Sequence, residues 1–149
     1  MSCQSALVLI KPDGMQKGIV GEVIASFMAS GLKLTGLKLV RVSSRQARAH
    51  YGHLRGQCFF KEIVSYLMGE LHGKNPVVAM VFSGEDAIKT CRRIAGATNP
   101  EEADPTSVRG KFGRVTTKGV FENLVHVSSE PKEAQREIDL WFKKKELLG

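Results

Sequence analysis

Two short continuous apolar runs stand out along the chain, residues 6–10 and 77–82. Runs of this length between turn residues are typical of strands that are buried on both faces. Residues 32–42 alternate apolar and basic side chains and change register at Gly36, which predicts a half-exposed strand carrying a β-bulge. Residues 124–127 are predicted as the last strand.

Between the strands, apolar residues recur at helical spacing. The predicted helices cover residues 19–28, 43–51, 59–67, 87–95 and 130–142. Ser43 and Ser44 can cap the second helix, and Ser83 with Asp86 fits a capping box before the fourth. Residues 11–14 predict a turn, and residues 97–119, rich in glycine, proline, threonine and charge, predict a long loop that is functional or mobile.

These elements predict a compact α/β sandwich (α+β) in which helices cover an antiparallel sheet. Strands and helices interleave in uneven order, and the second strand alternates, which favours an antiparallel sheet. The length of 149 residues is typical of one domain, residues 1–149, and the chain carries no linker or internal repeat.

Composition excludes several classes of protein. Hydrophobic residues make up 42% of the chain and charged residues 25%, as in ordinary soluble globular proteins. No apolar run approaches the ~20 residues that cross a bilayer, and the N-terminus lacks the basic region of a signal peptide. We therefore expect a cytoplasmic protein without membrane association. The three cysteines fit no metal or redox spacing and are expected to be reduced thiols.

The net charge of +7 indicates an anionic partner. Nucleotides, nucleic acids and acidic membranes all qualify, and charge alone does not choose among them. Residues 69–75 have one residue too few between their glycines for a P-loop, and no G-x-G-x-x-G occurs. His50 and His53 lie three apart without a local carboxylate or thiol, which predicts a solvated pair rather than a metal site.

The segment ENLVHVSSE, residues 122–130, places His126 at the end of the last predicted strand. A histidine there is either an ordinary strand end or a nucleophile that accepts a phosphoryl group. On a regular strand His126 and Ser128 face one way and Asn123 the other. If all three serve one pocket, the chain must bend between Asn123 and His126.

Phosphate-competent groups are scattered over the rest of the chain. Each alone has an ordinary interpretation as a surface, turn or helix residue. Together they predict a nucleotide site, because cations neutralise phosphates and a carboxylate can fix the tautomer of a histidine. The groups are Lys11, Arg92, Thr98, Arg109, Asn123, Ser128 and Glu137.

Several short motifs occur in order along nearly the whole chain. They are KPDGMQKG at 11–18, HY at 50–51, FF at 59–60, PVVAMV at 76–81, TNP at 98–100, VRG at 108–110 and EIDLWF at 137–142. With these motifs the chain resembles the nucleoside diphosphate kinase family, and the set is highly specific.

The resemblance implies an enzyme that moves the γ-phosphate of a nucleoside triphosphate, mainly ATP, onto a nucleoside diphosphate. It implies a ping-pong mechanism through a phosphohistidine at His126, with Mg²⁺ carried on the nucleotide phosphates and no metal ligand from the protein. It also implies a ferredoxin-like fold with a four-stranded antiparallel sheet, and a homo-oligomer (hexamers or tetramers of dimers).

The resemblance further implies a role for each matching residue. His126 is the nucleophile, Ser128 and Glu137 support it, and Lys11 belongs to both the catalytic and the nucleotide-binding groups. Phe59 stacks on the base, with Ile63 on its other side, where the family often has leucine. The remaining nucleotide-binding residues implied in this way are Tyr51, Arg92, Thr98, Arg109 and Asn123.

The chain departs from the family pattern at a few positions. Val127 replaces a smaller residue, and Lys111 and Ser129 replace acids. Residues of about 69–75 and about 115–121 look longer than in compact members of the family. Two alternatives stand beside an active kinase. Val127 is the reason to consider an inactive nucleotide-binding protein, and the net charge of +7 is the reason to consider a nucleic-acid-binding protein on the same fold, with nucleic-acid binding at best a side activity.

Overall fold

A computed structural model describes residues 2–149 and is built around a four-stranded sheet in the order β2-β3-β1-β6. Neighbouring strands are antiparallel throughout. The antiparallel sheet covered by helices confirms the prediction from the sequence pattern, and the arrangement is the ferredoxin-like α/β fold that the family resemblance implies. The strands are β1 (Cys3–Ile10), β2 (Lys33–Val40), β3 (Val77–Glu85) and β6 (Val125–Val127).

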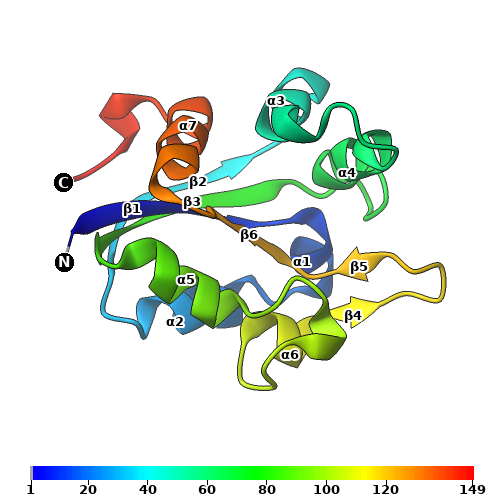
Figure 1. Cartoon of the computed structure of the whole chain (residues 1–149), viewed down its shortest axis with the longest axis horizontal. Helices are drawn as coiled ribbons and strands as arrows, with labels where there is room; N and C mark the ends of the chain where they lie inside the picture. The colour runs from blue at the N-terminus through cyan, green and yellow to red at the C-terminus, as the bar shows by residue number, and fades with distance from the viewer. Residues whose placement is uncertain (1) are drawn as a thin grey trace.

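Helices cover both faces of the sheet (Figure 1). Along β1, Val8 and Ile10 contact one helical layer and Leu7 and Leu9 contact the other, which explains the continuous apolar run. One layer contains α2 (Val20–Met28) and α5 (Ala87–Ala95). The other contains α3 (Ser44–His50), α4 (Phe60–Leu67) and α7 (Pro131–Trp141).

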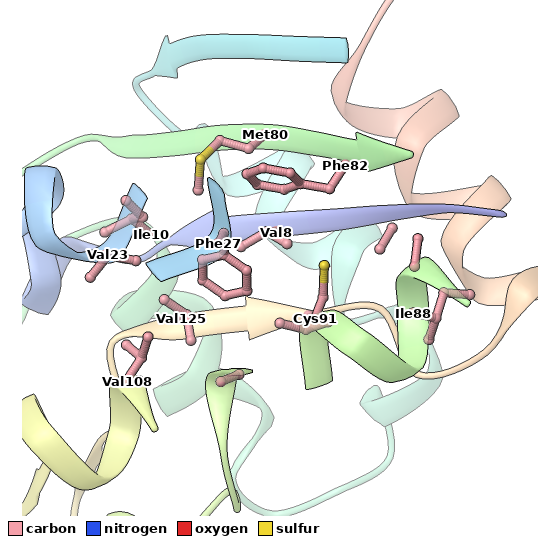
Figure 2. Packing of buried hydrophobic residues seen from close by; sticks show 14 of the residues in the cluster. Val8, Ile10, Val23, Phe27, Met80, Phe82, Ile88, Cys91, Val108 and Val125 are labelled. Carbon is pink, nitrogen blue, oxygen red and sulfur yellow. The ribbon is translucent and has the colours of Figure 1, made fainter. Parts of the chain in front are cut away.

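Figure 2 shows the core between the sheet and the α2–α5 layer. Phe27 of α2 stacks on Phe82 of β3 with ring centroids 5.7 Å apart, and Cys91 is buried among them as a free thiol. This packing makes the sheet a rigid platform, because close-packed interiors leave little room for movement. The two strands that carry Lys11 and His126 at or near their ends, β1 and β6, are neighbours in this platform.

Two local predictions are confirmed. The register between β2 and β3 shifts between Leu34 and Gly36, as expected for a bulge. The Ser43 hydroxyl accepts a hydrogen bond from the Gln46 N–H at 3.1 Å and so caps α3.

Three local predictions are wrong. Residues 11–14 are not a simple turn, because Pro12 stands in the first turn of a short helix, α1 (Pro12–Lys17), where a missing N–H is tolerated. Strand β3 continues through Ser83, so no capping box forms, and the residue before α5, Asp86, has a left-handed φ of 50°.

The predicted loop of residues 97–119 is the third error, because much of it is ordered into short elements. They are η2 (Pro100–Glu102), α6 (Val108–Phe112) and β4 (Arg114–Val115), which pairs with β5 (Phe121–Glu122). Arg109 therefore lies on α6 and not in a loop. Two further 3₁₀ turns are η1 (Gly52–Leu54) and η3 (Lys144–Glu146). Within residues 2–149, every helix falls short of the length and hydropathy that bilayer crossing requires.

Candidate active site

The chain bends at Leu124, just before β6. Its φ of 71° lies in the left-handed region, which a bulky residue rarely adopts. The Leu124 N–H donates to Asp13 Oδ2 at 3.0 Å, and the Leu124 carbonyl accepts from the Lys11 N–H at 2.8 Å. These contacts hold the strained backbone and bring Asn123 and His126 to the same cleft. The bend expected from the sequence is confirmed.

His126 is held through one ring nitrogen. It pairs with Leu9 of β1, and its Nε2 lies 2.8 Å from Glu137 Oε2 on α7. The Ser128 hydroxyl donates to the other oxygen of Glu137 at 2.7 Å. Because an ionised carboxylate only accepts hydrogen bonds, Nε2 carries a proton. The Nδ1 atom makes no hydrogen bond to another residue in the described part of the chain.

Glu137 is a buried carboxylate, only 3% exposed. Burial raises the pKa of Glu137, but the hydrogen bonds from His126 and Ser128 and the charge of Arg136 outweigh burial, so the pKa lies below its ordinary value. Glu137 is therefore ionised at neutral pH. The ionised carboxylate therefore accepts the hydrogen bond from His126 Nε2 and fixes the orientation of the ring.

Cationic side chains from three elements converge above His126. Lys11 follows β1, Arg92 lies on α5 and Arg109 on α6, and all three line a cleft of about 560 Å³. Burial lowers the pKa of Lys11 to about 8, with Asp13 opposing the shift and Arg109 reinforcing it. Burial likewise lowers the pKa of Arg109 to about 10, and nearby Arg92 contributes. Because burial and mutual repulsion disfavour these charges, a bound polyanion relieves the cluster.

Arg109 also supports the backbone around the histidine. Its guanidinium donates to the carbonyls of Gly96, Asn123 and Val125 at 2.7, 3.3 and 2.8 Å. A guanidinium has five N–H donors, so two of them stay available for a ligand in the cleft. Arg109 is thus both a part of the site's structure and a phosphate-competent group.

Asn123 connects the cleft's lysine to the segment after α5. Lys11 Nζ donates to Asn123 Oδ1 at 2.5 Å, and Asn123 Nδ2 donates to the Thr98 carbonyl at 3.0 Å. The lysine head group is therefore fixed in the cleft before any ligand binds, which lowers the entropy lost on binding.

A second, more apolar cleft of about 520 Å³ adjoins the first and shares Lys11, Ile63, Thr98 and Asn123 with it. Phe59 lines it and is 43% exposed, so its ring is available to a flat ligand group. The β4–β5 hairpin completes the lining with Val120 and Phe121. The first cleft thus places cations beside His126. The second, called the aromatic cleft below, adjoins it and is lined by Phe59 and Phe121.

The prediction that His50 and His53 form a solvated pair is wrong for His50. His53 is exposed as expected, but His50 is only 1% exposed and is no solvated residue. Trp141 Nε1 donates to His50 Nδ1 at 3.0 Å, and the His50 ring stands edge-on to His126 at a centroid distance of 4.5 Å. Burial lowers the pKa of His50 well below its ordinary value, and the charges of His126 and Arg136 add to this. His50 is therefore a neutral packing neighbour of His126.

The donor set around His126 does not fit a resident metal ion. His50, His126 and Glu137 bring one potential ligand atom each within 4.8 Å of one another. However, Trp141 occupies the Nδ1 lone pair of His50, so Nε2 carries the proton and offers no lone pair. Both oxygens of Glu137 are already hydrogen-bonded.

The structure brings every predicted site residue to the two clefts or directly beneath them. Ser128 lies beneath, fully buried, and Phe59 lines the aromatic cleft. The first cleft is lined by Lys11, Tyr51, Ile63, Arg92, Thr98, Arg109, Asn123, His126 and Glu137.

The sequence analysis missed several side chains at or near the site, among them His50, Trp141, Val120, Phe121, Tyr66 and Glu133. The only signal for Val120 and Phe121 was an apolar pair at the end of a polar stretch. His50 immediately precedes Tyr51, and the two rings pack edge-on with centroids 4.7 Å apart. Because adjacent residues on a helix usually point in different directions, no local pattern indicates this contact.

Val127 lies regularly in β6 opposite Val8 and is buried. A β-branched residue suits a strand, so its size does not distort the backbone at His126. Ser129 lines the cleft, and Lys111 is exposed on α6.

A histidine with one nitrogen fixed by a buried carboxylate, beneath desolvated cations, defines a site for covalent phosphoryl transfer. Comparison with known proteins identifies the family. A family model described as nucleoside diphosphate kinase matches residues 4–147. A nucleoside diphosphate kinase of Picosynechococcus sp. is 46% identical over 146 residues, which is 98% of this chain and 92% of that protein.

Solved structures agree in fold. The nucleoside diphosphate kinase of Aquifex aeolicus superposes with a TM-score of 0.89 at 37% identity, covering 99% of this chain and 100% of that one. A transition-state mimic of the Borrelia burgdorferi nucleoside diphosphate kinase with bound vanadate and ADP superposes with a TM-score of 0.88 at 29% identity, covering 99% of this chain and 91% of that one. The chain belongs to the nucleoside diphosphate kinase family.

Proposed function

We propose that this protein transfers the γ-phosphate of a nucleoside triphosphate, mainly ATP, to a nucleoside diphosphate through a phosphohistidine at His126. The observation that carries this proposal is the hydrogen bond of 2.8 Å between His126 Nε2 and Glu137. Because Nε2 carries the proton of this hydrogen bond, Nδ1 is the ring nitrogen that has a free lone pair. We infer that Nδ1 takes the phosphate.

The first half-reaction begins when the triphosphate binds with its phosphates among the cleft cations. Nδ1 of His126 attacks the γ-phosphorus, a P–N bond forms, and the bond to the β,γ-bridging oxygen breaks. The diphosphate leaves with that oxygen. The phosphorylated imidazole keeps its proton on Nε2, and the negative charge of Glu137 stabilises the ring.

In the second half-reaction a different diphosphate occupies the same cleft. Its terminal phosphate oxygen attacks the phosphohistidine, the P–N bond breaks, and the triphosphate leaves. Lys11 and Arg109 face the phosphates in both halves and stabilise the charge that spreads over the transferred group. Ser128 holds Glu137 in place, and Phe59 stacks on the base without selecting its identity.

We propose that the divalent cation in this reaction is Mg²⁺ and that it arrives on the nucleotide as part of the substrate. The carboxylates that line the first cleft are Glu133 and Glu137. Glu133 pairs with Arg136 at 2.9 Å and Glu137 is held by His126, so neither is a ready ligand for a hard cation. The nucleotide phosphates supply that ligand set.

We further propose that residues 1–149 act as one domain in a homo-oligomer, as hexamers or tetramers of dimers. Strand β2 forms an edge of the sheet, and Leu37 and Leu39 along it are 54% and 64% exposed. An exposed apolar edge strand is a surface that proteins usually cover. A cytoplasmic location is supported by the free thiols of Cys3, Cys58 and Cys91.

The two alternatives receive less support. Val127, the reason to consider an inactive nucleotide-binding protein, lies in a regular strand. The charge of +7, the reason to consider nucleic acid, is explained in part by the cations gathered at the cleft.

Steady-state kinetics tests the proposal. With ATP and a second diphosphate varied together, we expect parallel double-reciprocal lines, because a phosphoenzyme separates the two half-reactions. Phosphoenzyme isolated after ATP treatment should discharge its phosphate to added diphosphate in the absence of ATP. Intersecting lines, or an enzyme that discharges only to water, would contradict transfer through a covalent intermediate.

A further inference from the structure

The wall of the aromatic cleft is a hairpin too small to hold its own shape. Strands β4 and β5 share the pairs Arg114↔Glu122 and Val115↔Phe121, and the turn closes with the Thr116 N–H donating to the Val120 carbonyl at 2.9 Å. Figure 1 shows the hairpin projecting from the end of the sheet. A two-stranded hairpin is marginally stable in water, so its position depends on contacts with the body of the protein.

One such contact is a buried carboxylate on β5. Glu122 is 4% exposed, and both of its oxygens are engaged. Arg114 Nε, within the hairpin, donates to Oε1 at 2.6 Å, and His72 Nε2 lies 3.0 Å from Oε2. His72 is also buried, at 6% exposure, and belongs to the segment between α4 and β3. Glu122 thus joins the hairpin to a part of the chain far away in sequence.

His72 also contacts a residue that lines the aromatic cleft. The His72 ring packs edge-on against Tyr66 of α4 with centroids 4.9 Å apart. Tyr66 lines the aromatic cleft, and Lys11 Nζ lies 4.5 Å above its ring. On the hairpin side, Glu122 is flanked by Phe121, which lines the cleft, and by Asn123, which fixes Lys11.

The energetics favour a rigid junction. A carboxylate buried in this way is stable only while its partners stay in place, because removing one partner leaves an uncompensated charge. Burial raises the pKa of Glu122, but the hydrogen bonds and charges of Arg114 and His72 outweigh it, and the pKa lies below its ordinary value. Moving the hairpin away from the body of the protein must break the Glu122–His72 bond, whereas the Arg114–Glu122 bond lies within the hairpin and keeps the Glu122 carboxylate in place for that contact. The contact therefore holds the hairpin at the cleft that Phe59 also lines.

We propose that His72, Glu122 and Arg114 form a positioning clamp that fixes the β4–β5 hairpin as the second wall of the nucleobase site, with Phe121 and Val120 facing the base that Phe59 stacks on. The clamp sets how much the base contributes to binding and transfer, and it leaves the chemistry at His126 to other residues. The proposal rests on the proposed function.

Two substrates that differ only in the base test the clamp: ATP and ribose 5-triphosphate. The readout is kcat/KM for phosphoenzyme formation with each, in the wild type and in Glu122→Ala. We expect the ATP value to fall about tenfold relative to the ribose 5-triphosphate value, roughly the weight of one lost base-stacking contact. Glu122→Gln, which has the same shape and can hydrogen-bond to both partners, should restore most of the preference for ATP.

His72→Ala should lower the preference for ATP over ribose 5-triphosphate as much as Glu122→Ala does. The His72→Ala/Glu122→Ala double variant should show no larger loss than either single variant, because each of these variants breaks the same contact. Matched controls are Lys118→Ala at the exposed hairpin turn and Glu70→Gln in the exposed part of the segment that carries His72. Both should retain the wild-type ratio.

A clamp variant that loses activity equally on both substrates would show a general structural brace and overturn the proposal, as would a variant with an unchanged ratio. Should Glu122→Ala fail to fold, the His72→Ala variant makes the same test from the other side. Failure of the proposed function is distinguishable, since then the wild type itself would form no phosphoenzyme with either substrate.

Discussion

His126→Ala is expected to lower turnover between ATP and a second nucleoside diphosphate by roughly 10⁵-fold, the scale seen when a nucleophile is removed. The reason is that Nδ1 of His126 supplies the covalent route, and the other groups of the cleft only bind and stabilise the phosphates. The nearest other imidazole, His50, cannot substitute, because it is buried and Trp141 fixes its protonated nitrogen as Nε2. Turnover is measured with a coupled assay at saturating substrates.

Nucleotide binding is the control for this variant. Lys11, Arg92 and Arg109 all remain in the variant, so the Kd of His126→Ala for ADP should stay within about threefold of the wild type by calorimetry, a free-energy difference no larger than one hydrogen bond. Residual turnover within about a hundredfold of the wild type, in a variant that binds normally, would assign the chemistry to another group.

Lys11→Met is expected to lower kcat/KM for a triphosphate by about 10²- to 10³-fold, the usual weight of one preorganised charge at a transition state. Lys11 is 8% exposed, and Met fills nearly the same space. Because burial already disfavours the lysine charge, removing it should leave the thermal midpoint within a few degrees of the wild type. A midpoint that collapsed with the activity would mean that Lys11 holds the fold, and not the phosphates.

The pH profile provides a second check on Lys11. Its pKa of about 8 means that the free enzyme loses this charge as the pH rises through that value. In the wild type kcat/KM should therefore fall on the alkaline side with an apparent pKa near 8, since this parameter reports the free enzyme. In Lys11→Met this alkaline fall of kcat/KM, the alkaline limb of the pH profile, should be absent. A limb that persists in the variant belongs to another group.

The secondary structure is largely readable from the sequence where one periodicity dominates. The apolar runs of β1 and β3 and the helical spacing in α5 and α7 predict their elements to within a few residues. Prediction failed where tertiary contacts decide: Arg109 was expected in a loop and lies on α6, and the sequence predicts a bend before His126 but not the residue that makes it. Leu124 adopts a left-handed conformation only because Asp13 and Lys11, more than a hundred residues away, bond its backbone.

Dependence on distant contacts also decides which residues of the site can be recognised from the sequence. Residues such as Lys11, Arg109 and Glu137 are recognisable from motifs, because phosphate binding restricts which side chains can serve. His50 and Glu122 are not, because their roles come from partners that no local pattern indicates, Trp141 in one case and His72 in the other. Spacing likewise does not say which nitrogen of His126 is free, whereas the hydrogen bond to Glu137 does.

Labelling the protein with [γ-³²P]ATP tests the central claim most directly. We expect an acid-labile, alkali-stable label that maps to the peptide containing His126 and disappears in His126→Ala. Phosphorus–nitrogen correlation in NMR spectra should place the phosphate on Nδ1. A label of equal intensity in that variant, or one that resists acid, would contradict a phosphohistidine at His126.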